Sequence, residues 1–123
     1  MNTQNTPSPV GHMNESFFAH PSEKRTAVML DANNVGYIYR FRVTAKKKDK
    51  IIETEIDFFL LDAINVRGHG LVKHIENKNR KSIKAENQQN LLKDNGYETL
   101  IVTTKMLDDF ERNGFMEGEK RHL

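Results

Sequence analysis

The chain has 123 residues, which is enough for one domain and too few for two. Apolar residues make up 37% and charged residues 29%, so a small core can form under a strongly polar surface. No run approaches the roughly 18 to 20 apolar residues of a membrane span, and no signal pattern opens the chain, so we expect a cytoplasmic protein without membrane contact. Without cysteine, disulfides and thiol catalysis are excluded, and any metal must be held by carboxylates, carbonyls or His.

Residues 1–13 are expected to form a disordered tail, because they contain Pro7, Pro9 and small polar residues with almost nothing to bury. The string Gly11-His12-Met13 is also typical of a cloning junction. Residues 14–116 should form a single domain, and residues 117–123 a charged C-terminal tail. Within the domain, residues 14–31 predict one or two short helices, with Ser22 as a candidate N-cap.

Three strands are expected next. Residues 35–44 are rich in β-branched and aromatic residues, and a lysine-rich connection, AKKKDK, joins them to a second strand over residues 51–62. We expect these two strands to pair as a hairpin. A third strand is expected over residues 71–78. Strand alternation would place Glu53, Glu55 and Asp57 on one face, opposite Ile52, Ile56 and Phe58; on the third strand, His74, Glu76 and Lys78 would share a face.

The last elements are a helix, a strand and a helix. Ser82 can cap a helix that runs to Asn95, and Gly96 would end it in the left-handed conformation. Residues 97–104 predict a buried strand, and residues 107–115 a terminal helix. The order α-β-β-β-α-β-α predicts an α/β fold in which helices flank a central mixed sheet of about four strands.

The arrangement of Asp57, Glu76 and Lys78 suggests phosphodiester hydrolysis. This reaction needs an activated water, neutralisation of negative charge in the transition state and help for the leaving oxygen, and a divalent ion can supply all three. Mg²⁺ is typically held by one or two carboxylates plus substrate phosphate. Residues two apart on a strand face the same way, so Glu-x-Lys would place Lys78 beside Glu76.

The segment EIDFFLLD…LVKHIENK…KAENQQNLLKDNGYETLIVTT resembles the PD-(D/E)XK nuclease superfamily, in particular its small VRR-NUC-type and Holliday-junction-resolvase-like members. The resemblance implies a restriction-endonuclease-like core and a Mg²⁺- or Mn²⁺-dependent nuclease, with DNA the favoured substrate. It makes Asp57 the first metal ligand, Glu76 the second and Lys78 the catalytic lysine, with the Asn77 carbonyl as an extra ligand.

The same resemblance suggests accessory residues. Members of the superfamily place a Gln early in the helix after Glu-x-Lys, which makes Gln88 or Gln89 a candidate, and an acid on the N-terminal helix, for which Glu15 and Glu23 both qualify. Glu55 and His74 could also approach the site, although pairing with lysines and a structural hydrogen bond are the more ordinary roles for such residues.

Basic residues surround the candidate acids and would suit the phosphates of a nucleic acid. The candidate nucleic-acid-binding residues are Lys46, Lys47, Lys48, Arg80, Lys81 and Lys84. Nucleases that cut both strands commonly act as symmetric dimers, so a homodimer is a further candidate assembly.

Two alternatives stay open at the level of sequence. One is a noncatalytic nucleic-acid-binding module, either an inactive nuclease fold or an open barrel of OB type built on residues 35–62. The other is a phage- or plasmid-encoded protein-interaction factor whose charged surface meets a protein. Affinity for nucleic acid that rises as salt falls would separate the first from the second.

Overall fold

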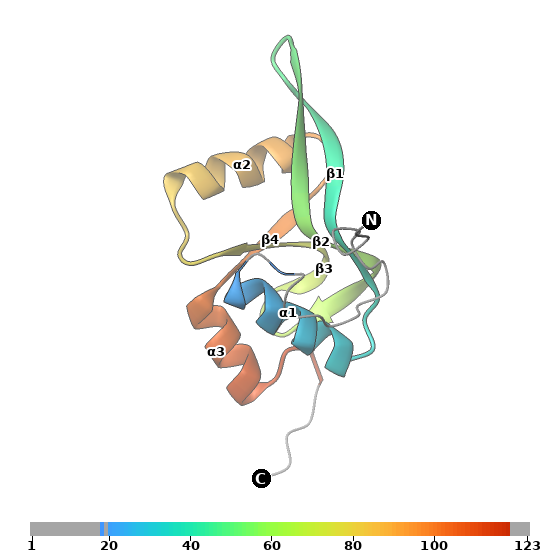
Figure 1. The fold of residues 1–123 in the computed structure, drawn as a ribbon, viewed down its shortest axis with the longest axis vertical. Helices are drawn as coiled ribbons and strands as arrows, with labels where there is room; N and C mark the ends of the chain where they lie inside the picture. Colours follow the sequence, from blue (N-terminus) through green and yellow to red (C-terminus); the bar gives the residue numbers. More distant parts are fainter. Residues whose placement is uncertain (1–17, 19, 119–123) are drawn as a thin grey trace, which may run out of the picture.

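The computed structural model describes residue 18 and residues 20–118 and contains seven elements (Figure 1). In chain order they are α1 (Pro21–Ala32), β1 (Tyr37–Lys47), β2 (Lys50–Val66), β3 (Gly70–Lys78), α2 (Ile83–Asp94), β4 (Thr99–Thr103) and α3 (Thr104–Asn113). The predicted order of helices and strands is therefore confirmed. The expected tail over residues 1–13 and residues 119–123 lie outside the described residues, as does Glu15.

The four strands form one open sheet in the order β1-β2-β3-β4. The first three are antiparallel to their neighbours, whereas β3 and β4 are parallel and are joined by α2. A parallel pair requires such a crossover, and the fold is α/β with a mixed sheet, as expected. An OB-type barrel is wrong for residues 35–62, because the sheet does not close.

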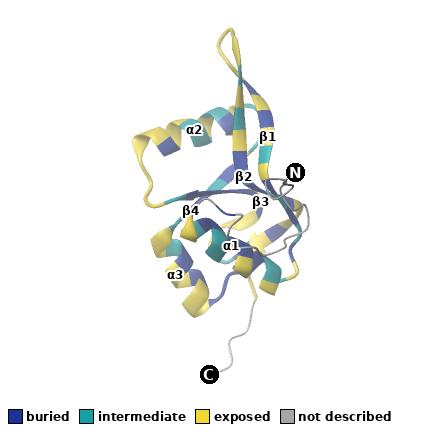
Figure 2. Cartoon of the chain, in the orientation of Figure 1, coloured by how far each residue is buried: buried dark blue, intermediate teal, exposed yellow. Residues whose placement is uncertain are grey.

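Two hydrophobic clusters cover the sheet. The larger one joins α1 and α3 to the sheet through side chains such as Leu30, Phe58 and Leu107, and the smaller one brings Leu92 of α2 onto Val43 and Ile56. Figure 1 shows α1 and α3 together at one end of the molecule and α2 apart from them, beside the long β1–β2 hairpin. Burial is accordingly concentrated where the strands meet the helices, and the hairpin end is exposed (Figure 2).

The β1–β2 hairpin is longer than the sequence suggested. The lysine-rich segment expected as a connection is mostly strand: Lys47 pairs with Lys50 across a two-residue turn at Lys48 and Asp49, with Lys48 in the left-handed region at φ 54°. Short hairpin turns need such positive φ values to match the twist of the strands. Because the turn is this tight, it fixes the register of the whole hairpin.

A residue with a left-handed backbone conformation inside β1 marks the point where the strand passes from one hydrophobic cluster to the other. Arg40 has φ 55°, which is rare for a residue other than glycine. Before it, Tyr39 belongs to the larger cluster; after it, Phe41 packs against the smaller one. In β2 the predicted alternation is wrong between Ile56 and Phe58, which were expected to share a face. Phe58 belongs to the larger cluster and Ile56 to the smaller one.

The helix ends follow local hydrogen bonding. Ser82 caps α2 by accepting a hydrogen bond from the Ala85 N–H at 3.1 Å, and Gly96 follows α2 with φ 91°, so both predictions are confirmed. Ser22 is not an N-cap, since α1 already begins at Pro21. Helix α3 begins at Thr104 and not at residue 107 as expected, because the Thr103 hydroxyl caps it by accepting a hydrogen bond from the Met106 N–H.

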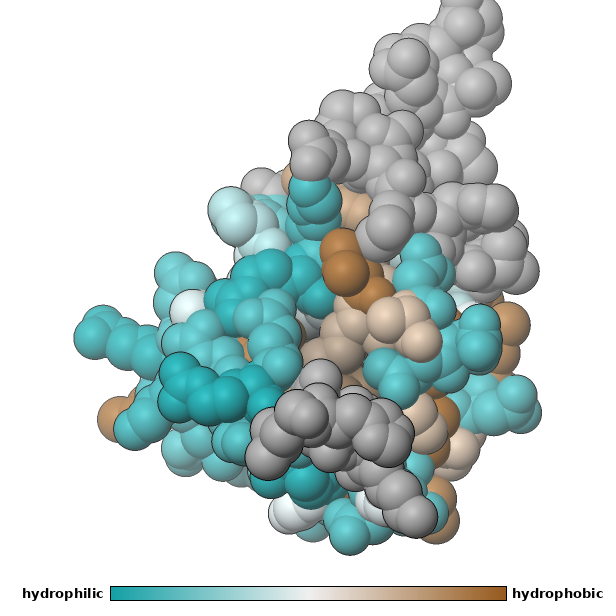
Figure 3. All heavy atoms as spheres, turned by 90° about the horizontal axis from the view of Figure 1, so that it is seen from below, coloured by the Kyte–Doolittle hydropathy of each residue, from teal (hydrophilic) through white to brown (hydrophobic). Residues whose placement is uncertain are grey.

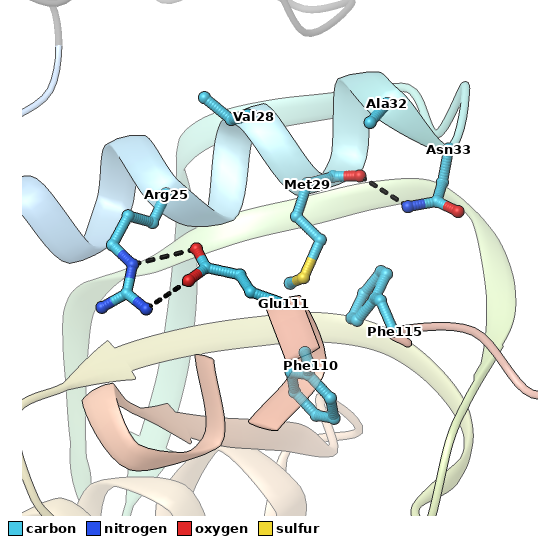
Figure 4. Close-up of a pocket in the computed structure, with 8 residues that line it drawn as sticks. All are labelled: Arg25, Val28, Met29, Ala32, Asn33, Phe110, Glu111 and Phe115. Atoms are coloured by element: carbon cyan, nitrogen blue, oxygen red, sulfur yellow. Dashed lines mark hydrogen bonds and ion pairs between the residues drawn. The ribbon is translucent and has the colours of Figure 1, made fainter. Parts of the chain in front are cut away.

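One surface cluster ties α1 to α3. Arg25 donates hydrogen bonds to Glu111 at 2.6 and 3.0 Å (Figure 4). It also donates to Asp108 at 2.7 Å, and we call these three residues the α1–α3 ion-pair cluster. Arg25 and Glu111 line a pocket of about 210 Å³ together with apolar residues such as Met29 and Phe115. Seen from below, hydrophilic side chains gather where α3 lies, with apolar surface next to them (Figure 3).

The C-terminal end of the described chain remains bonded to the sheet. Met116 forms a bridge with Val66, and the Glu117 N–H donates to the Asn65 carbonyl at 2.8 Å, one residue beyond the predicted end of the domain. Across residues 18 and 20–118, no helix is long and apolar enough to cross a membrane.

Candidate functional site

The candidate site lies where β2 and β3 separate. These strands pair at Phe58 with Ile75 and at Phe59 with His74, but the pairing does not continue toward the hairpin. The next two residues in this register are Asp57 and Glu76. From there β2 follows β1 into the hairpin, whereas β3 ends at Lys78. The two sequence-predicted acids therefore face each other at the fork, as neighbouring strands predict.

The carboxylates of Asp57 and Glu76 occupy the backbone hydrogen-bonding positions that the fork leaves open. Asp57 Oδ2 accepts from the Asn77 N–H at 2.8 Å, and Glu76 Oε1 accepts from the Asp57 N–H at 3.2 Å. Buried backbone N–H groups need acceptors, so each acid satisfies a donor on or beside the opposite strand. We call Asp57 and Glu76 the acid pair.

The acid pair is electrostatically unfavourable when both members are ionised. Burial first, and then the negative charge of Asp57, raise the pKa of Glu76 to about 8. Burial also raises the pKa of Asp57, and the Glu23 carboxylate adds to this, although the Asn77 N–H opposes it. Asp57 is half-buried and Glu76 is buried. Neighbouring carboxylates that are withdrawn from water share a proton or need a cation.

Two positive side chains act on the acid pair. The ammonium of Lys78 lowers the pKa of both acids, which fits the position that Glu-x-Lys predicted for it. Arg40 lowers the pKa of Asp57 as well. Sequence reasoning missed Arg40, although the register of the hairpin, with Tyr39 opposite Phe58 and Phe41 opposite Ile56, places it across from Asp57.

An acid from α1 approaches from the other direction. Glu23 is buried, accepts a hydrogen bond from the Tyr39 hydroxyl and influences Asp57 electrostatically. One turn farther along α1, the Thr26 hydroxyl accepts from the Asn77 side-chain amide at 2.9 Å. Asn77 thus binds α1 through its side chain and Asp57 through its backbone, so that α1 and the strand fork are held together.

The donor set fits a hard divalent ion, although it is incomplete by itself. Within residues 18 and 20–118, no three Asp, Glu or His side chains converge in metal-ligand geometry. Proteins nevertheless usually coordinate Mg²⁺ through only one or two carboxylates, and water and substrate fill the remaining coordination positions. The N–H and C=O of a strand residue point toward the same neighbour, so the Asn77 carbonyl is expected to face β2 as its N–H does.

The proposed accessory residues other than Glu23 have partners of their own. Glu55 is exposed and lies 4.0 Å from Arg42 across the hairpin. The His74 ring packs between Phe59 and Tyr97, with Nδ1 3.0 Å from the Glu98 carbonyl oxygen. These contacts give both side chains structural roles.

The two glutamines of α2 also contact the sheet. Gln88 donates to the Thr54 hydroxyl at 3.3 Å, which links α2 to the hairpin, and Gln89 donates to the Thr99 carbonyl at 2.8 Å, which links α2 to β4. Neither has a hydrogen bond to the acid pair among the described residues. Both amides therefore position α2 on the sheet.

The candidate nucleic-acid-binding residues are all exposed and form two groups at opposite ends of α2. Arg80, Lys81 and Lys84 surround its start. Its far end is bonded to the hairpin near Lys46, Lys47 and Lys48, because Asn95 accepts from the Lys46 N–H at 2.8 Å. The helix has 12 residues and is about 18 Å long, so the two basic groups are separated by about this distance.

Comparison with protein-family models, curated protein sequences and solved structures finds no match to this chain. The functional interpretation therefore depends on the geometry of the site.

Proposed function

We propose that this protein is a Mg²⁺-dependent nuclease with a PD-(D/E)XK-type site at the fork between β2 and β3. The observation that carries the proposal is the position of Asp57 and Glu76 at the fork, where each carboxylate accepts a hydrogen bond from the backbone of the opposite strand and the Lys78 ammonium influences both. A purely structural pair would be expected to include a compensating cation in direct contact. A pair that binds a divalent ion needs no such side-chain cation, and burial together with the charge of Asp57 raises the pKa of Glu76 to about 8, as is common at functional sites.

Each residue has a distinct role in this proposal. Asp57 and Glu76 hold the ion, with the Asn77 carbonyl as a further ligand, and Lys78 supplies a compact positive charge for the attacking water or the scissile phosphate. Glu23 sets the charge around Asp57 from α1. When bound, a divalent ion lowers the pKa of a coordinated water and neutralises charge on the phosphate oxygens.

The exposed basic groups support a polyanionic substrate. The groups at the two ends of α2 would contact phosphates of a strand that runs past the acid pair, and we take DNA as the favoured substrate. Each phosphate contact that is lost should reduce the salt dependence of binding by roughly one unit in log K against log salt. Replacing Lys46, Lys47 and Lys48 by Gln is therefore expected to flatten the salt dependence of DNA binding.

A noncatalytic nucleic-acid-binding module is the second candidate. It is favoured by the hydrogen bonds of the acid pair, because both carboxylates satisfy backbone N–H groups and could be retained for the fold alone. The two functions differ in what the metal does: a nuclease needs the ion for cleavage, whereas a binding module with a structural acid pair does not respond to it.

Cleavage of a labelled DNA substrate in the presence and absence of Mg²⁺ tests the proposal. Asp57→Asn, Glu76→Gln and Lys78→Met keep the size of each side chain and should each reduce cleavage by at least about 100-fold, as loss of a catalytic group or ligand commonly does. Single-stranded, flapped and duplex DNA should be assayed in parallel.

Glu55→Gln is the matched control, since Glu55 is an exposed acid two residues from Asp57 on the same strand. This variant should keep wild-type activity. Full activity of Glu76→Gln, or a folded wild-type protein that binds DNA and cleaves none of the substrates with Mg²⁺ or Mn²⁺, would reject the nuclease assignment and favour the binding module.

A further inference from the structure

A polar groove runs between the β1–β2 hairpin and α2. Its volume is about 460 Å³, more than twice that of the pocket between α1 and α3. Gln88 of α2 donates a hydrogen bond to the Thr54 hydroxyl of β2, so the two walls are joined within the groove. We call it the hairpin–α2 groove. Its volume lies within the range of sites that hold one small ligand, and it is much too small for a duplex.

The groove is lined by groups that recognise base edges better than phosphates. Its polar side chains are two carboxylates, three amides and a hydroxyl, contributed by Glu53, Asp94, Asn87, Gln88, Asn90 and Thr54. Among the described residues that line it, Lys47 is the one cation, and two carboxylates would repel a phosphate. Carboxylates accept hydrogen bonds from the exocyclic amino groups of bases, and amides can both donate and accept.

Apolar atoms in the groove could contact the flat face of a base. Ile52 of β2 and Leu91 of α2 are half-buried and line the groove from its two walls. Flat contact of a base with apolar or aromatic surface is a common component of single-strand binding. The groove thus combines an apolar contact surface with acceptors for amino groups.

The position of the groove also fits a nucleic-acid strand. Basic groups flank α2 at both ends, and the groove lies along the same helix between them. Thr54 is three residues before Asp57 on β2, which is about 10 Å, or roughly three stacked base steps of a duplex strand. A base held in the groove would therefore belong to a nucleotide close to the scissile phosphate.

We propose that the hairpin–α2 groove binds one unpaired base of a nucleic-acid strand and prefers bases with an exocyclic amino group over thymine. The inference rests on the proposed function in taking that strand to be the substrate. The base is unpaired because the groove is too small for a duplex, and an unpaired base can offer both amino hydrogens to the carboxylates. The groove would direct cleavage toward single-stranded or flapped DNA.

Binding of fluorescently labelled dC12 and dT12 tests the proposal by anisotropy, in EDTA and at about 50 mM salt. The two strands have equal charge and similar size; cytosine has the exocyclic amino group, whereas thymine has a carbonyl in its place, an N3–H and a C5 methyl group. The dissociation constant for dC12 is expected to be about 5- to 10-fold lower than that for dT12, the lower part of the discrimination found for base-edge contacts.

The double variant Glu53→Gln, Asp94→Asn should lose this preference and bind both strands equally, because amides can also donate to the thymine carbonyls. Asp62→Asn is the matched control: it removes an exposed acid of β2 that does not line the groove and should keep the preference. Equal affinity of the wild-type protein for dC12 and dT12 would overturn the proposal, as would a preference retained by the folded double variant.

This experiment separates the groove from the nuclease site because EDTA prevents metal-dependent cleavage. Magnesium-dependent cleavage without a preference for dC12 would reject the groove and retain the nuclease. A preference for dC12 that depends on Glu53 and Asp94, without cleavage under any metal condition, would retain the groove and reject the nuclease.

Discussion

Two regions beside α1 gather carboxylates in different ways. In the α1–α3 ion-pair cluster, Asp108 and Glu111 share the Arg25 guanidinium at the surface. In the acid pair, a half-buried Asp57 and a buried Glu76 lie side by side at the strand fork. Hydrogen bonding to Arg25 lowers the pKa of Glu111, whereas burial and a like charge raise the pKa of Glu76 to about 8.

The ion-pair cluster contains charges that stabilise the fold, whereas the acid pair contains charges that destabilise it. The ion-pair cluster joins two helices and gains modestly from it, as exposed ion pairs do. The acid pair places two like-charged groups side by side, one buried and one half-buried, which is unfavourable unless an ion or proton is bound. Such a site is typical of a functional position. Replacing charges in the two regions should therefore have opposite effects on stability.

The largest effect is expected at Glu76. The variant Glu76→Gln keeps the acceptor for the Asp57 N–H and removes the buried negative charge. At pH 8 without metal it should raise the free energy of unfolding by on the order of 2 kcal/mol, since each unit of pKa shift corresponds to about 1.4 kcal/mol and relaxation reduces the total. Urea unfolding of the two proteins measures the difference; a variant less stable than wild type would contradict it.

The same group predicts a pH dependence. The folded pKa of Glu76 is raised to about 8, whereas the unfolded value is 4.5. Between these values the unfolded chain releases a proton that the folded protein keeps, so the contribution of Glu76 to stability falls as pH rises from about 4.5 to 8. Urea midpoints across this range should converge for wild type and Glu76→Gln at low pH and separate at high pH. Parallel profiles would show that Glu76 titrates normally.

A bound divalent metal ion should offset the destabilisation of the folded protein by the acid pair. An ion that binds only the folded protein stabilises it by about 1.4 kcal/mol at ten times its dissociation constant. Mg²⁺ should therefore raise the melting temperature of wild type and leave Asp57→Asn and Glu76→Gln nearly unchanged. The Arg25→Met variant is the control for general salt effects and should respond as wild type does.

The smallest effect is expected in the ion-pair cluster. Arg25→Met removes the shared cation and should lower the free energy of unfolding by at most about 1 kcal/mol, with a smaller loss at 1 M salt, where surface charges are screened. Lys105→Met, an exposed cation on α3, is the matched control and should be neutral. A loss well above 1 kcal/mol would mean that the cluster is more than a surface contact.

The sequence predicts elements whose signals are local. Ser82 and Gly96 define α2 because a hydroxyl cap and a left-handed glycine act on their immediate neighbours. Strand alternation likewise places Glu76 and Lys78 together, and neighbouring strands bring Asp57 to Glu76. Strand alternation thus sufficed for Glu76 and Lys78, whereas the pairing of Asp57 with Glu76 also needed the family resemblance and the expectation that their strands are neighbours.

Features that depend on strand register were not predictable from local patterns. The left-handed Arg40 and the extra residues of β2 between Phe59 and Ile64 break the period of two on which strand predictions depend. The lysine-rich segment AKKKDK was expected to be a loop, and a loop does not fix the register of the hairpin. The position of Arg40 opposite Asp57 was therefore not predicted. The sequence also did not show whether Glu15 or Glu23 approaches Asp57, because the position of Glu23 depends on how α1 packs against Tyr39.

The most direct test of the shared ion site is a Mn²⁺ titration followed by electron paramagnetic resonance, which distinguishes bound from free ion. Wild-type protein should bind Mn²⁺ at a site that is lost in both Asp57→Asn and Glu76→Gln and kept in Glu55→Gln. Binding that survives in either acid-pair variant, or no binding to wild type at millimolar Mn²⁺, would contradict the assignment of Asp57 and Glu76 as ligands of one ion.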